Sequence, residues 1–154
     1  MGIRNQLAFF SILLLAASVE APAQTIAVQG GNQIIKLTGG TPIVDPMVSS
    51  NTTCTLQWKR PKNTAKITVS TICPGQKFTL KVYAINAQDG DAAPEVTLTT
   101  GMLAVDFVTN LNGNRTKTYT CTLRYTASAT YAQGNSSELG GDDVHTVRYT
   151  ILEQ

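Results

Sequence analysis

The residues best suited to chemistry in this sequence are three cysteines, one histidine and a few acidic side chains. Cys54, Cys73 and Cys121 are widely spaced and form none of the close Cys or His pairs that zinc sites typically show. In an oxidising compartment, three cysteines predict one disulfide and one remaining thiol. Cys54 and Cys73 lie symmetrically about the turn at residues 63–64, which slightly favours a bridge across a hairpin. The alternative is that Cys54 and Cys121 join two sheets.

The lone histidine, His145, follows two aspartates at residues 142–143. A serine–histidine–aspartate site would have to recruit Ser136 or Ser137 from a glycine-containing loop, and the sequence has no Gly-x-Ser-x-Gly nucleophile elbow. We therefore predict a protein that is not an enzyme and needs no cofactor or metal. A small secreted hydrolase that depends on His145 is the less favoured alternative.

Oxygen ligands and aromatic rings suggest two further kinds of binding surface. The 89–91 loop, with Glu95 nearby, offers carboxylates to calcium but lacks the spacing of an EF-hand loop, so an ordinary polar turn is favoured. Tyr83 is the best candidate for an exposed aromatic contact, whereas core packing is favoured for Trp58, Tyr119 and Tyr125 because they alternate with cysteine and leucine.

The N-terminal segment predicts export. Residues 7–19 are an apolar run that follows Arg4 and precedes Ala21-Pro22-Ala23. The run is too short to cross a bilayer, which takes about 20 residues, but it suits a signal peptide cleaved after Ala23. We expect residues 1–23 to be a signal peptide and residues 24–154 to be one domain. The product is then secreted or on the cell surface, with no transmembrane segment after cleavage, and its net charge of +2 does not suggest a nucleic-acid partner.

The elements that must position these residues are predicted to be β-strands. Apolar residues alternate with period two, and clusters of Gly, Asn, Pro and Asp separate the alternating runs. This pattern predicts an all-β fold, an antiparallel β-sandwich of immunoglobulin-like or pilin-like Greek-key type with about 7–9 strands. The candidate strands are 25–28, 33–37, 53–59, 66–72, 77–85, 95–99, 102–108, 116–127 and 144–152.

The alternation also predicts which side chains are buried. Residues two apart on a strand share a face, so one face of each strand collects the apolar residues. The predicted dry layer contains Leu56, Val69, Leu80, Leu123 and the three cysteines.

The two ends of the predicted domain carry a resemblance. The last strand alternates after Gly140-Gly141, and a short alternating segment follows the signal peptide. These ends resemble bacterial fimbrial subunits of the chaperone–usher kind, whose N-terminal segment serves as a donor strand for a neighbouring subunit. The resemblance departs from the fimbrial pattern in its cysteine spacing and because tyrosine is not penultimate. The residues that it implicates in assembly are Ile26, Val28, Ile34, Ile35, Leu37, Val147, Tyr149 and Ile151.

This resemblance implies a non-enzymatic subunit of a cell-surface filament or adhesive structure, with protein partners that include copies of itself. Tyr119-Thr120-Cys121 also resembles the Tyr-x-Cys motif of immunoglobulin-like domains, but Trp58 lies on the strand of Cys54 rather than on the next one, so only the architecture is implied. The alternative function is a soluble carbohydrate- or protein-binding module that uses loops such as 86–94 and 133–143. Glycosylation sequons begin at Asn51, Asn114 and Asn135.

Overall fold

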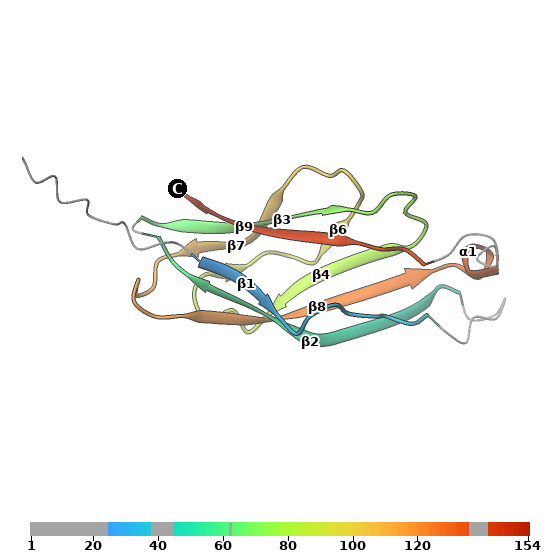
Figure 1. The fold of residues 1–154 in the computed structure, drawn as a ribbon, viewed down its shortest axis with the longest axis horizontal. Coiled ribbons are helices and arrows are strands. Elements are labelled where there is room, and N and C mark those ends of the chain that lie inside the picture. The colour runs from blue at the N-terminus through green and yellow to red at the C-terminus, as the bar shows by residue number, and fades with distance from the viewer. Residues whose placement is uncertain (1–24, 38–44, 62, 136–141) are drawn as a thin grey trace, which may run out of the picture.

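The period-two alternation of the sequence becomes two antiparallel β-sheets packed face to face in the computed structural model (Figure 1). These two packed sheets confirm the predicted β-sandwich. The structure describes residues 25–37, 45–61, 63–135 and 142–154. The predicted signal peptide, residues 1–23, lies outside the described residues. Within the described part of the chain, no helix has the length and apolar character needed to cross a membrane.

The strands divide into a sheet of five and a sheet of four. The first sheet has the order β1 (Thr25–Gln29), β2 (Met47–Lys59), β8 (Tyr119–Ala129), β4 (Thr79–Ile85) and β6 (Val96–Leu98). The second sheet has the order β5 (Asp91–Ala92), β7 (Val105–Leu111), β3 (Ala65–Ile72) and β9 (Thr146–Glu153). A short helix, α1 (Tyr131–Asn135), follows β8 at one end of the sandwich (Figure 1).

The order of the strands shows that the chain alternates between the sheets. From β2 to β9, every connection leads from one sheet to the other, so strands that are consecutive in the sequence do not pair. Cys54 on β2 and Cys73 after β3 are thus in different layers, and the predicted hairpin disulfide is wrong. All three cysteines are buried free thiols.

The alternative disulfide is also wrong as a link between sheets, because Cys54 and Cys121 lie on adjacent strands of the first sheet. There Cys54 is opposite Leu123, and Leu56 is opposite Cys121. The two near-identical segments, TCTLQW on β2 and TCTLRY on β8, run antiparallel beside each other. A cysteine of each segment therefore faces a leucine of the other.

The predicted dry layer is confirmed by the burial of its members. Leu56, Val69 and Leu123 have no exposed surface, and Leu80 is partly buried against them. Phe107 and Tyr149 pack together in the second sheet with ring centroids 5.3 Å apart. Burial of such side chains is the main stabilising contribution in a fold of this kind.

The structure differs from the predicted strands most clearly at residues 33–37, which are not a strand. Gly30 and Gly31 have positive φ angles of 109° and 65°, a conformation that turns the chain away from the sheet. The Gln33 side chain then donates to the Gly30 carbonyl at 2.6 Å. Ile34 is consequently 79% exposed. The predicted strand at residues 33–37 is therefore wrong, while a part for Ile34, Ile35 and Leu37 in assembly stays a prediction.

Other differences concern strand limits and short elements. β2 begins earlier than predicted and contains an irregularity between Asn51 and Cys54, so Asn51 lies in a strand rather than in a turn. The two-residue strand β5 and the helix α1 were not predicted. Both are too short to produce a recognisable period in the sequence.

A buried hydrogen bond connects the two sheets through their tyrosines. The Tyr125 hydroxyl on β8 lies 2.8 Å from the Tyr149 hydroxyl on β9. Burial raises the pKa of Tyr125 to about 12. Burial and the neighbouring phenol also raise the pKa of Tyr149 above its usual value.

This tyrosine pair predicts a loss of stability in alkali. Above the ordinary phenol pKa of about 10 the unfolded chain loses protons that the folded chain keeps, so the free energy of unfolding falls as the pH rises toward about 12. We expect a slope of about 1.4 kcal/mol per pH unit for each phenol. Denaturant unfolding at several alkaline pH values measures this slope.

The matched control is the double variant Tyr125→Phe with Tyr149→Phe. Removing both hydroxyls leaves no unpaired polar group, so the change should cost little at pH 7. It should also flatten the alkaline slope. Equal slopes for the double variant and the original protein would contradict the prediction.

Candidate functional site

Three residues with different ligand atoms meet at the ends of two paired strands. Cys73 follows β3 directly, and Asp143 and His145 precede β9. Since Ile72 pairs with Thr146, these two segments leave the second sheet side by side. One ligand atom from each of Cys73, Asp143 and His145 lies within 4.8 Å of the other two. We call these three residues the CDH cluster.

The Asp143 carboxylate is held by the backbone that leads into β4. Its Oδ2 atom accepts hydrogen bonds from the N–H groups of Lys77 and Phe78, both at 2.8 Å. These two donors orient the carboxylate and stabilise its charge. The Oδ1 atom takes no part in these two bonds.

The His145 ring is oriented by the buried hydroxyl of Thr71. His145 Nδ1 lies 3.3 Å from Thr71 Oγ1, and the same hydroxyl donates to the Thr146 carbonyl at 3.4 Å. The Thr71 hydroxyl thus holds the imidazole ring by its Nδ1 atom. Burial lowers the pKa of His145, and the nearby Asp143 charge opposes that shift.

The third member, Cys73, has no exposed surface. Burial and the charge of Asp143 raise the pKa of its thiol, while a hydrogen bond from the Val144 backbone lowers it. A nucleophilic cysteine needs the opposite, a depressed pKa next to a cationic group. Cys73 therefore lacks the depressed pKa of an activated nucleophile.

The CDH cluster was not predicted from the sequence. Asp143 and His145 were candidates only together with Ser136 or Ser137, which lie outside the described residues, and the local spacing of Cys and His predicted no metal site. Cys73 reaches His145 only because β3 and β9 pair in the second sheet. The sequence did place Cys73 and His145 at the limits of predicted strands, but it did not show that these two strands pair.

Five of the predicted assembly residues lie in β1 or β9, which are edge strands. Ile26 and Val28 are on β1, opposite Trp58 and Leu56 of β2. β1 therefore pairs within its own chain. Val147, Tyr149 and Ile151 point inward from β9 toward the core. β1 and β9 are edge strands of different sheets and approach each other at one side of the sandwich.

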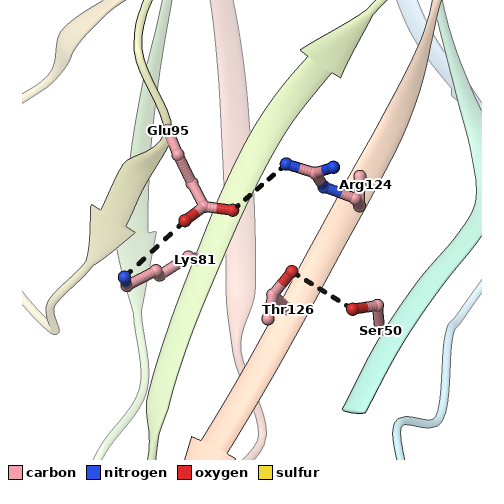
Figure 2. Close-up of polar contacts among 5 residues, drawn as sticks. All are labelled: Ser50, Lys81, Glu95, Arg124 and Thr126. Atoms are coloured by element: carbon pink, nitrogen blue, oxygen red, sulfur yellow. Dashed lines mark hydrogen bonds and ion pairs between the residues drawn. The ribbon is translucent and has the colours of Figure 1, made fainter. Parts of the chain in front are cut away.

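The first sheet carries an ion-pair group around Glu95 and, separate from it, a contact between the Ser50 and Thr126 hydroxyls (Figure 2). Glu95 lies 3.6 Å from both Lys81 Nζ and Arg124 Nη2. The Arg124 guanidinium also lies 5.2 Å from the Tyr83 ring centre, so Tyr83 is on the outer face as predicted, with a cation over its ring. Pairs this exposed contribute little to stability.

The carboxylates considered for calcium face different partners. Asp89 is buried and accepts from the N–H groups of Asn112 and Gly113. Asp91 accepts from the Asn110 side chain at 2.7 Å, and Glu95 is engaged on the outer face. The three carboxylates are therefore each engaged by a different partner.

The comparisons with known proteins add no relative. The family models, the curated proteins and the solved structures contain no match to this chain. Its fold places it among all-β sandwich proteins with two antiparallel sheets.

Proposed function

We propose that this chain is a non-enzymatic, exported structural protein that assembles with copies of itself by β-strand addition. The apolar segment at residues 7–19 and the small residues before Gln24 support export. The raised pKa of the Cys73 thiol supports a role without an activated cysteine nucleophile. The main support for assembly comes from the edge strand β9.

β9 is the longest edge strand among the described residues. It has 8 residues and pairs on one side with β3, in a register that runs without interruption from Thr146 to Glu153. The other edge strands are shorter, with 5 residues in β1, 2 in β5 and 3 in β6. Natural sheets protect such edges with proline, bulges or inward charges. β9 contains no proline, and its inward side chains are Val147, Tyr149 and Ile151.

β1 is the segment best suited to add to that edge in a second copy. Four of its 5 residues are exposed in the present arrangement, so little buried surface holds it against β2. Its inward residues, Ile26 and Val28, have the alternation that an added strand needs. Strand addition joins two chains by main-chain hydrogen bonds along a sheet edge.

A reversible tether tests the proposal. Ala27 and Gln57 are directly opposite each other on the outer face, so Ala27→Cys with Gln57→Cys can form a disulfide that keeps β1 in its own sheet. We expect the original protein to form polymers, seen by light scattering, electron microscopy and a ladder in unheated gels. The oxidised tether should remain monomeric, and reduction should restore the polymers.

The matched control is a tether that leaves β1 free. Lys81→Cys with Thr97→Cys joins β4 to β6 at another directly opposed pair, and this variant should polymerise when oxidised. Polymers in the oxidised β1 tether, or an original protein that stays monomeric at high concentration, would contradict assembly through β1.

A further inference from the structure

We propose that the CDH cluster, Cys73, Asp143 and His145, is a binding site for a zinc-type divalent cation. This site does not depend on the proposed assembly. The types of ligand, their separation and the groups that orient them support it.

The types of ligand favour a borderline-soft metal ion. The cluster offers one sulfur, one imidazole nitrogen and one carboxylate oxygen, and this set suits Zn²⁺ better than Mg²⁺ or Ca²⁺, which prefer oxygen ligands. Three protein ligands leave a fourth tetrahedral position for water or an external ligand. Two of the three side chains are only partly buried, so an ion can reach the site from solvent.

The separation of the ligand atoms is compatible with one shared ion. Zinc bonds of about 2.3 Å to sulfur and about 2.0–2.2 Å to nitrogen or oxygen place tetrahedral ligands about 3.3–3.7 Å apart. The three atoms here lie within 4.8 Å of one another. Closing the remaining gap requires movements of about 1 Å, which side-chain rotation can supply.

The surrounding groups orient the ligands before an ion arrives. The Thr71 hydroxyl contacts Nδ1 of His145 and so orients the imidazole ring. The N–H groups of Lys77 and Phe78 hold one oxygen of Asp143. Metal-binding histidines and carboxylates in proteins usually have such supporting hydrogen bonds.

Metal binding would release a proton and join three segments of the fold. The Cys73 thiol loses its proton as the sulfur–zinc bond forms, and the proton passes to solvent. The ion would then connect the end of β3 with the start of β9, next to the backbone that enters β4. Because the unfolded chain does not hold these ligands together, bound zinc should raise the thermal unfolding midpoint.

The test titrates the reduced, chelator-treated protein with Zn²⁺ by calorimetry and with Co²⁺ by absorption spectroscopy. We expect one ion per chain, a higher unfolding midpoint with Zn²⁺ and a sulfur-to-cobalt charge-transfer band. Cys73→Ser should remove the band, and His145→Gln should weaken binding by at least about 10-fold. Thr71→Val should weaken binding by about 10-fold and keep the band, because it removes only the group that positions His145.

Cys121→Ser is the matched control, since Cys121 is a buried thiol of the first sheet outside the cluster. It should bind both ions like the original protein. Circular dichroism of each variant confirms that it is folded. Absence of the cobalt–sulfur band in the original protein, or its persistence in Cys73→Ser, would overturn the proposal.

Discussion

Gly90→Ala should lower the free energy of unfolding by about 3 kcal/mol. Gly90 lies between β4 and β5 with a φ angle of 92°, which disfavours any side chain. A Cβ atom added here would collide with the Thr109 carbonyl oxygen, and it would lie 2.8 Å from Leu111 Cδ2 and 3.1 Å from Val108 Cγ1. Val108 and Leu111 are fully buried in β7, so they have little room to move.

The surroundings of Gly90 increase the expected effect. The preceding residue, Asp89, accepts hydrogen bonds from the N–H groups of Asn112 and Gly113 in the loop after β7. A shift of the loop at residue 90 would disturb these two bonds to a buried carboxylate. Leaving such a group unpaired is costly.

Gly75→Ala is the matched control. Gly75 has a similar positive φ angle of 71°, but an added Cβ atom meets nothing within 4 Å. Only the backbone strain remains, and the expected loss is about 1 kcal/mol. Chemical denaturation at neutral pH measures both variants. Equal losses would show that close packing at Gly90 does not contribute.

Leu123→Ala should be comparably damaging, with a loss of about 3–4 kcal/mol in the free energy of unfolding. Leu123 is fully buried near the middle of β8, opposite Cys54 on β2 and Ala84 on β4. These neighbours are small, so they cannot fill the cavity that alanine would leave. The loss therefore includes both the transfer of the side chain and the cavity.

The neighbouring residue provides the control for this prediction. Thr122 lies on the outer face of the same strand, opposite Thr55 and Ile85. Thr122→Ala should change the free energy of unfolding by less than about 1 kcal/mol, because it removes little buried surface. Denaturant unfolding of both variants, compared at the same pH, measures the contrast. A Thr122→Ala loss as large as that of Leu123→Ala would contradict the assignment of the two faces.

The strand pattern of this chain could be predicted because it depends on local chemistry. Alternating residues such as Leu56 and Val69 identify the inward face wherever a strand occurs, and both side chains are fully buried. The segment at 33–37 alternates in the same way but is not a strand, since Gly30 and Gly31 turn the chain and the Gln33 side chain bonds to its own turn.

Strand pairing could not be predicted from the same pattern. In the sequence, a loop between two alternating segments has the same residue pattern whether it closes a hairpin or crosses from one sheet to the other. The predicted disulfide between Cys54 and Cys73 was wrong because the loop after β2 leads to the opposite sheet. The grouping of Cys73 with His145 was also inaccessible, because it depends on the pairing of β3 with β9.

The sequence by itself determined the β class of this protein, the inward side chains of most strands and the burial of all three cysteines, because side-chain alternation and hydrophobicity are properties of neighbouring residues. Only the tertiary structure decided which strands are neighbours, which strands lie at the sheet edges and which ligand atoms meet. Those outcomes depend on contacts between residues far apart in the chain, for which a single sequence carries no local signal.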